Sequence, residues 1–275
     1  MDSVAGGHTK KMRLLSTHRS ELNQLFVFEL SDGYKVESVF YRGDTLCIST
    51  QVGCAIKCPF CLSGSLGLVR NLSSEEIYAQ YDLLKDTLPI RRIAVAGIGE
   101  PLMNYPNVVM SFWRFKNMGL KVSFYTIGFP HTYLGHLIKL PHSGITVSIH
   151  STRADKRKKL IPHGGNLETL ISTLRKEIEG LSKRKKKKIS LAYLLLKGIN
   201  DSYEELEEFV RLVSELGVSA TLLYYNDTGS FKAPSEQEYE ERFLFLKKHG
   251  IKVTLSTRFR KDKLGGCGML LVNRV

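Results

Sequence analysis

The chain has 275 residues, of which 43% are hydrophobic, and this is enough to bury the core of one large domain. It contains no run of about 18 apolar residues and begins without the apolar segment of a signal peptide, so we expect a cytoplasmic protein without a membrane span. The 40 Lys and Arg residues outnumber the 27 Asp and Glu residues, and the resulting net charge of +13 favours a polyanionic partner such as nucleic acid.

The spacing of apolar residues predicts six strand–helix units in succession. The expected strands are 45–50, 92–96, 121–127, 144–150, 189–196 and 219–225, with a last strand at 252–259. The expected helices are 74–85, 107–118, 133–140, 167–179, 202–216 and 235–249. Alternation at roughly 30-residue spacing predicts a parallel sheet of α/β class, and six units favour a partial (β/α)6 barrel over an eightfold one. In such folds the chemistry lies at the carboxyl ends of the strands.

A small β-hairpin is expected before the barrel, with strands at 25–30 and 34–41 joined by a turn at 31–33. The first 20 or so residues are polar, and we expect them to be frayed. The predicted organisation is therefore a short extension at 1–24, a hairpin extension at 25–44 and the barrel at 45–275.

Three cysteines, Cys54, Cys58 and Cys61, follow the first barrel strand with C-x3-C-x2-C spacing. Iron–sulfur clusters are held by Cys thiolates and a 4Fe–4S cluster normally takes four, so three ligands leave one iron open for a substrate or cofactor. A structural zinc site is the alternative, but it usually needs a fourth Cys or His. The other two cysteines, Cys47 and Cys267, are not spaced like a second ligand pair.

Basic residues gather in two runs, one of Arg153 with 156–159 and one at 183–188. Each run is interpreted either as a contact to nucleic-acid phosphates or as a solvated loop or helix end. The overall excess of positive charge favours the first interpretation.

The chain resembles the RlmN/Cfr family of radical S-adenosylmethionine (SAM) RNA methyltransferases. The resemblance rests on segments that occur in the family's order over about residues 34–270. These segments are 45–61, which contains the cysteine triad, then 67–72, 97–102, 148–150, 198–201 and 267–268.

The resemblance implies a role for each matching residue. Cys54, Cys58 and Cys61 would hold a 4Fe–4S cluster that binds and cleaves SAM. The expected SAM contacts are Gly99 and Glu100 for the methionine amino group, Ser148, Ile149, His150 and Asn226. Tyr125 is a further expected contact, although the family usually has a serine at that position. Glu100 as a turn cap and Ser148 as a packing residue are the structural alternatives.

The resemblance also implies a mechanism that consumes two SAM molecules per turnover. Cys267 would receive a methyl group from the first, and the radical generated from the second would take a hydrogen atom from that methyl. The resulting carbon radical would add to an adenine ring carbon. Glu37 would accept a proton from the adduct, and Cys47 would release the product by forming a disulfide with Cys267. The alternatives are a small buried residue for Cys47 and an exposed strand carboxylate for Glu37.

Two departures from the family bear on the substrate. Only about 25 residues precede the predicted hairpin, where the family has a helical accessory domain that grips RNA, and the acidic pattern usual before the methyl-carrying cysteine is missing. The first hypothesis is methylation of adenine C2 or C8 in rRNA or tRNA. The enzyme would act as a monomer and receive electrons from a flavodoxin or ferredoxin. The second is a radical SAM methyltransferase for a protein or small heterocycle. The third is a cluster- or zinc-binding RNA module without catalysis, against which both Cys47 and Cys267 argue.

Overall fold

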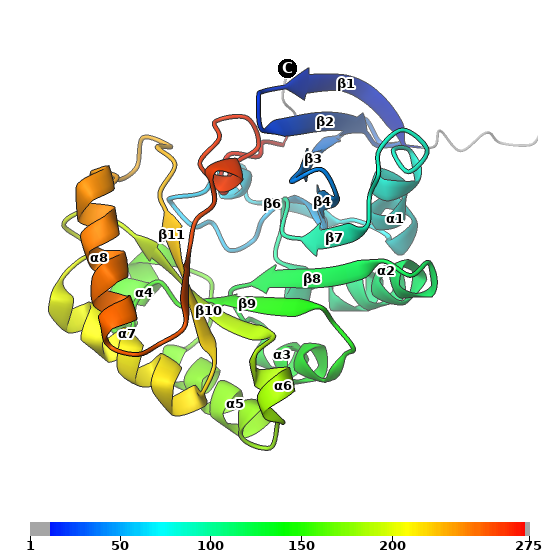
Figure 1. Cartoon of the computed structure of the whole chain (residues 1–275). Coiled ribbons are helices and arrows are strands. Elements are labelled where there is room, and N and C mark those ends of the chain that lie inside the picture. Colours follow the sequence, from blue (N-terminus) through cyan, green and yellow to red (C-terminus); the bar gives the residue numbers. More distant parts are fainter. Residues whose placement is uncertain (1–11, 273–275) are drawn as a thin grey trace, which may run out of the picture.

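The computed structural model describes residues 12–272, and its centre is one curved ten-stranded sheet (Figure 1). The strand order is β1-β2-β3-β4-β7-β8-β9-β10-β11-β12. The parallel part comprises β4 (Thr45–Ile48), β7 (Arg92–Val95), β8 (Lys121–Thr126), β9 (Gly144–Ser148), β10 (Ile189–Leu195), β11 (Ser219–Tyr224) and β12 (Val253–Leu255). Because these strands are parallel, their carboxyl ends meet at one rim of the open barrel.

Helices cover the outer, convex side of the parallel strands (Figure 1). They are α1 (Ser74–Asp82), α2 (Tyr105–Asn117), α3 (His131–Lys139), α5 (Leu167–Glu179), α7 (Tyr203–Leu216) and α8 (Glu236–Lys248). The predicted capping box opens α1, since Ser73 Oγ accepts from the Glu76 amide and the Glu76 carboxylate accepts from the Ser73 amide. Helix α7 buries the apolar stripe of Leu206, Phe209 and Val213, and each such side chain contributes about 1.5–3 kcal/mol by leaving water. The predicted partial (β/α)6 barrel is therefore confirmed.

The predicted hairpin is also confirmed, but the sheet reaches further than expected. Strands β2 (Asn23–Glu29) and β3 (Lys35–Tyr41) pair antiparallel, and β3 pairs antiparallel with β4. Residues Arg13–Arg19, expected to be frayed, form a further strand, β1, on the edge of β2. Its side chains are nearly all exposed, so it lacks the apolar alternation that marks a half-buried strand.

Several short elements between the main strands and helices were missed because each has only three to seven residues. Strands β5 (Gln51–Gly53) and β6 (Leu68–Asn71) form a separate antiparallel ladder around the cysteine loop. The remaining short elements are α4 (Ala154–Leu160), α6 (Lys183–Lys186), and three turns of 3-10 helix, η1 (Leu62–Gly64), η2 (Pro101–Asn104) and η3 (Arg258–Arg260). The expected strand at 252–259 is wrong in its second half, because β12 ends at Leu255 and the chain then turns into η3. Within residues 12–272 no helix is both long and apolar enough to cross a bilayer.

Candidate active site

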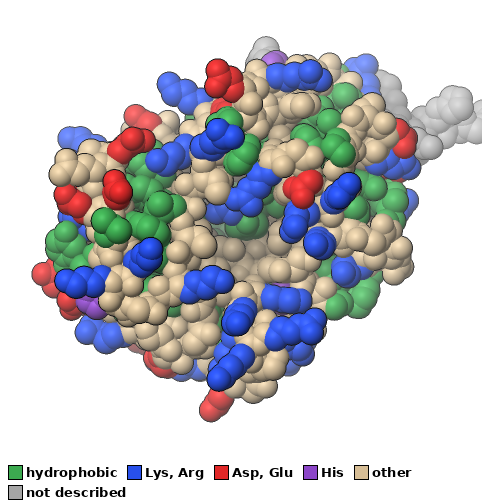
Figure 2. Space-filling view, in the orientation of Figure 1, with side chains coloured by type: hydrophobic (Ala, Val, Ile, Leu, Met, Phe, Trp, Pro, Cys, Tyr) green, Lys and Arg blue, Asp and Glu red, His purple; other side chains and the backbone are tan. Residues whose placement is uncertain are grey.

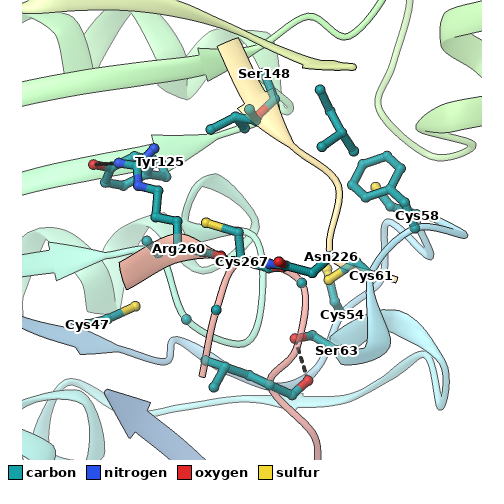
Figure 3. A pocket seen from close by; sticks show the side chains of 18 of the residues that line it. Cys47, Cys54, Cys58, Cys61, Ser63, Tyr125, Ser148, Asn226, Arg260 and Cys267 are labelled. Atoms are coloured by element: carbon teal, nitrogen blue, oxygen red, sulfur yellow. Dashed lines mark hydrogen bonds between the residues drawn. The ribbon is translucent and has the colours of Figure 1, made fainter. Parts of the chain in front are cut away.

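A pocket of about 240 Å³ opens at the carboxyl ends of the parallel strands. All five cysteines of the chain line it, together with side chains from β3, β8, β9, β11 and the C-terminal segment (Figure 3). Of the other residues expected at the site, Gly99, Glu100, Tyr125, Ser148, His150 and Asn226 also line the pocket. The structure therefore brings together residues that lie as much as 220 positions apart in the chain, from Cys47 to Cys267.

The cysteine triad lies on a tightly folded loop between β5 and β6. The Cys54 amide donates to Gly67 O over 3.0 Å, and the Cys61 amide donates to Cys58 O over 3.0 Å. Gly53 has a φ of +77°, and a Cβ there would lie 1.8 Å from Gly67 O, so only glycine lets the loop close. Burial raises the pKa of the Cys54 thiol to about 12 and raises those of Cys58 and Cys61 as well.

These three thiols suit an iron–sulfur cluster by their chemistry and placement. Within residues 12–272, no group of three or more His, Cys, Asp and Glu side chains is arranged to hold a metal ion. The thiols of Cys54, Cys58 and Cys61 instead come from one loop and face one pocket (Figure 3). A cluster spreads its Cys ligands over different iron atoms, so these residues are the ones that would hold it.

Gly99 and Glu100 form the turn after β7, and the Glu100 carboxylate is already bound by protein groups. It accepts hydrogen bonds from the Leu102 amide (3.1 Å), the Ile127 amide (2.9 Å) and the Thr126 hydroxyl. Burial raises the pKa of Glu100 to about 7, and the three donors act in the opposite direction. A Cβ on Gly99 would lie 2.7 Å from the Gln51 side chain. Glu100 thus ties β7 to β8, and its amide donates to Gln51 Oε1 over 2.8 Å, which holds the turn in place.

The three expected residues at the end of β9 have different surroundings. Ser148 lines the pocket, whereas the Ile149 side chain is fully buried in the main core and does not reach it. His150 lines the pocket with a left-handed φ of 59°, and its Nδ1 accepts from the Leu194 amide over 3.0 Å. Burial lowers the pKa of His150 to about 3, so its ring is neutral. The His150 carbonyl accepts from Asn200 Nδ2 over 2.6 Å, which joins β9 to β10.

The C-terminal segment folds back over the rim and carries Cys267 into the pocket. Asn226 fixes it, because its Nδ2 donates to Arg260 O (2.7 Å) and to Cys267 O (2.9 Å). A Cβ on Gly265 would lie 2.5 Å from Val39, and one on Gly266 would lie 2.2 Å from Asp262 O. The glycines that stand where an acidic pattern was expected thus allow close packing of this C-terminal loop, residues 258–268.

Cys47 and Glu37 lie on the side of the sheet that faces the pocket. Cys47 is paired in register with Val39, and alternation along β3 places Glu37, Val39 and Tyr41 on one face. Cys47, Val39 and Tyr41 line the pocket, but Glu37 does not; its carboxylate is fully buried and accepts from the Leu271 amide over 2.8 Å. The alternative of an exposed strand carboxylate is therefore wrong, and Glu37 anchors the chain behind Cys267.

The first basic run, expected to contact phosphates, is largely used inside the protein. Arg157 is 1% exposed and donates to Ile127 O (2.9 Å) and Ser148 O (3.3 Å), while its Nε has no partner in the described structure. Lys156 pairs with the buried Glu205 at 2.8 Å, and Arg153 pairs with Glu208 at 3.2 Å. The only sequence signal for the burial of Arg157 is its position three residues before the apolar Leu160, which places both on the same face of α4. Lys158 and Lys159 remain exposed.

The second basic run lies at the opposite end of the barrel from the pocket. It forms the short helix α6, and Lys188 O accepts from the Ile145 amide at the beginning of β9. On the face shown in Figure 2, Lys and Arg side chains surround a hollow near the middle, and acidic groups lie mainly toward the edge. At the pocket, the guanidinium groups of Arg42 and Arg258 lie within 6.0 Å of the ring centre of Phe259, which lines it.

Three comparisons with known proteins bear on the family to which this chain belongs. Residues 48–213 match the Radical SAM superfamily. The chain is 32% identical over 269 residues to a "Probable RNA methyltransferase" of Azoarcus sp. (strain BH72), covering 94% of this chain and 76% of that protein. It is 32% identical over 262 residues to a "Probable dual-specificity RNA methyltransferase RlmN" of Pseudothermotoga lettingae, covering 91% of this chain and 76% of the other.

A solved structure shares the fold. The crystal structure of a radical SAM methyltransferase from Sphaerobacter thermophilus superposes with a TM-score of 0.84 and 26% identity, covering 94% of this chain and 81% of that one. The described fold, the cysteine loop at the strand ends and these similarities lead to one conclusion. The chain belongs to the RlmN-like family of radical SAM RNA methyltransferases.

Proposed function

We propose that this enzyme methylates an adenine ring carbon, C2 or C8, in rRNA or tRNA, using a methyl group carried by Cys267. The observation that supports this most directly is that all five cysteines line one pocket. Three suffice for a cluster, and neither cluster binding nor RNA binding needs Cys47 and Cys267. Their presence in the same pocket fits a thiol that carries a methyl group and a second thiol that releases the product.

The residues would share the work as follows. The cluster on Cys54, Cys58 and Cys61 supplies reductive cleavage of SAM when it is bound, and two SAM molecules are used per turnover. The turn at Gly99 and the ends of β8, β9 and β11, with Tyr125, Ser148, His150 and Asn226, would line the SAM site. The Ile149 side chain points into the core, so only its backbone can contribute.

Product release would use Glu37 and Cys47. After the carbon radical on the Cys267 methylene has bonded to the ring carbon, a base would remove the ring proton, a step for which Glu37 is the candidate. The unpaired electron left on the adduct would pass to a one-electron acceptor, either the oxidised cluster or its flavodoxin- or ferredoxin-type partner. Cys47 then attacks the Cys267 sulfur, so the S–S bond forms and the C–S bond breaks. The C–S electron pair stays on the methylene carbon, which takes up a proton to become the methyl group. Access to Glu37 requires the segment at Leu271 to move, because that amide now occupies its carboxylate.

Variants of the two thiols test this assignment. Cys267 from cells with an intact cluster should carry a methyl group in peptide mass spectrometry. Cys267→Ala should still form 5′-deoxyadenosine but no methylated RNA, and Cys47→Ala should accumulate a protein–RNA species joined through Cys267. Methylated RNA from Cys267→Ala would exclude the carrier role, and normal turnover of Cys47→Ala would show that Cys47 only packs.

A non-RNA substrate, either a protein or a small heterocycle, is the second candidate function. It is favoured by the burial of Arg157 and the pairing of Lys156, which remove two of the expected phosphate contacts. Mass spectrometry of rRNA and tRNA from cells with and without the gene separates the two. A methylated adenosine that depends on the gene supports RNA, and unchanged RNA supports the second candidate.

A further inference from the structure

Two arginines lie beside aromatic rings that line the pocket. Tyr41, at the end of β3, and Phe259, on the C-terminal loop, both line it, and their ring centres are 6.4 Å apart. The Cζ of Arg42 lies 5.9 Å from the ring centre of Tyr41 and 6.0 Å from that of Phe259. The Cζ of Arg258 lies 5.4 Å from the ring centre of Phe259. Both arginines are exposed and neither lines the pocket, so these four residues, the arginine–aromatic patch, reach from the pocket wall to the surface.

The patch is fixed in place by contacts between the two ends of the chain. The C-terminal loop passes beside the beginning of β2, where Asn23 Nδ2 donates to Phe259 O over 2.9 Å (Figure 1). Asn23 is also the register partner of Tyr41 across β2 and β3. On the same loop, the Cys267 amide donates to Arg260 O over 3.2 Å. Phe259 is therefore held next to Tyr41 by the same fold of the chain that carries Cys267 into the pocket.

Neither arginine of the patch has a carboxylate partner. Among residues 12–272, no ion pair joins Arg42 or Arg258 to an acidic side chain. Asp44, on the same turn as Arg42, pairs with Arg92 at 3.0 Å. Asp262, on the same loop as Arg258, accepts from a serine hydroxyl at 2.6 Å and from a backbone amide at 2.7 Å. Two guanidinium groups beside one ring, without a counter-charge, favour an anionic ligand at that place.

The backbone at Arg42 is an independent sign that its side chain is needed. Arg42 has a left-handed φ of +59°, and Gly43 after it has a φ of +72°. Glycine and asparagine adopt this conformation more readily than a residue with a long side chain. Strained positions of this kind are typical of functional sites. A turn that only joined β3 to β4 would be formed more easily by asparagine, so the presence of arginine supports a role for its guanidinium.

We propose that the arginine–aromatic patch binds an unpaired RNA nucleotide next to the adenine that enters the pocket. The inference rests on the function proposed above, in which the adenine must leave its stack to reach Cys267. The neighbouring base would stack on the ring of Phe259 or on a guanidinium plane. Arg42 and Arg258 would bind the phosphates that flank it, because a guanidinium matches the geometry of a phosphate. Held in this way, the strand would keep the adenine from returning to its stack.

Salt-titrated RNA binding without SAM tests the two charges. The full chain is titrated with a short single-stranded RNA that carries iodouridine beside an adenosine. Arg42→Asn removes one charge with a residue that tolerates the left-handed backbone, and Arg258→Gln removes the other. Each change should reduce the logarithmic salt slope by about 0.7, because one phosphate contact of a single strand is lost. Arg184→Gln, which removes an exposed charge from α6 at the other end of the barrel, is the matched control and should leave the slope unchanged.

Phe259→Leu tests stacking separately from charge. Leucine keeps an apolar side chain but offers no ring face, so RNA binding should weaken about fivefold or more while the salt slope stays the same. Under near-ultraviolet light, iodouridine crosslinks to a stacked aromatic ring, and mass spectrometry should locate the crosslink at Phe259 or Tyr41. Phe243→Leu, the same change on α8, is the control. Trypsin cleavage after Lys263 at the wild-type rate would show that the C-terminal loop remains closed in the Phe259 variant.

Three results would overturn the proposal. The first is wild-type affinity and salt slope in Arg42→Asn, Arg258→Gln and Phe259→Leu. The second is a crosslink that maps outside the patch. The third is an acidic peptide that displaces the RNA as well as unlabelled RNA of the same charge does, which would favour a protein substrate.

Failure of this inference is distinguishable from failure of the proposed function. A methylated adenosine that depends on the gene, together with wild-type RNA binding by all three variants, would leave the function standing and remove the patch from it. RNA that is identical in cells with and without the gene would count against the function, whereas the binding and crosslinking results use no methyl transfer and would stand.

Discussion

Replacing Asn226 by Ala should open the loop that carries Cys267. The Asn226 amide makes two hydrogen bonds, to Arg260 O at 2.7 Å and to Cys267 O at 2.9 Å, and alanine makes neither. A net hydrogen bond contributes about 0.5–1.5 kcal/mol, so the closed loop should lose about 1–3 kcal/mol. That loss corresponds to roughly a 5- to 150-fold larger population of the open loop.

Limited proteolysis measures this population. Lys263 is exposed in the same loop, and trypsin cleavage after it follows the open fraction when the loop closes faster than it is cut. Asn226→Ala should therefore be cut after Lys263 about 5- to 150-fold faster than wild type. Asn117→Ala, an exposed residue at the end of α2, is the matched control. Equal rates after Lys263, or equal acceleration at every site, would refute the view that Asn226 holds this loop.

Three more predictions concern the cluster, acid stability and RNA binding. Cys58→Ala should abolish both iron binding and SAM cleavage after anaerobic reconstitution, and full iron loading of that variant would contradict the cluster assignment. Burial lowers the pKa of His142 to about 4 from an ordinary 6.5, so the unfolded chain takes up the proton first and stability is lost as pH falls from 6.5 toward 4. At pH 5 the free energy of unfolding should be lower by about 2 kcal/mol than at neutral pH because of this group. In urea unfolding of the apoprotein, the free energy of unfolding of His142→Gln should depend less on pH than that of wild type. An equal dependence on pH would show that protonation of His142 is not responsible. Neutralising Lys158 and Lys159, which follow β9 near the pocket, should weaken RNA binding and reduce its logarithmic salt slope by up to about 1.8, whereas neutralising the lysines at 183–188 should change neither. The opposite ranking in salt-titrated binding would place the RNA on the far end of the barrel.

The barrel was predictable because its signals are local. The strand–helix alternation and the Ser73–Glu76 capping box depend on residues within a turn or two of one another, and these signals are confirmed. Strand β1 gave no such signal, because both of its faces are exposed. The basic run that contains Arg157 predicts a surface charge there, because a run of basic residues does not reveal which member faces the core.

The pocket's own contacts were harder to predict because they are long-range. Tyr125 and Arg260 lie 135 positions apart, and they form a hydrogen bond because the C-terminal loop returns across the rim. No local sequence pattern indicates this contact. The partners of Glu37 and Asn226 depend on the same return. Motif matching could therefore name the cysteines and several pocket residues, but not the contacts that set their chemistry.

The return of the C-terminal loop also sets the order in which the site is completed during synthesis. Contacts that close the pocket join early and late segments, such as Leu62 with Gly268 and Ser63 with Leu270. At about 5–20 residues per second, the roughly 200 residues between Cys61 and Cys267 take about 10–40 s to translate. During that interval the three triad cysteines have been translated, but the C-terminal segment that packs over their loop in the folded protein has not. If the proposed roles hold, the growing chain offers Cys54, Cys58 and Cys61 to a cluster donor before Cys267, the proposed methyl carrier, has been made, and cofactor loading can precede catalysis.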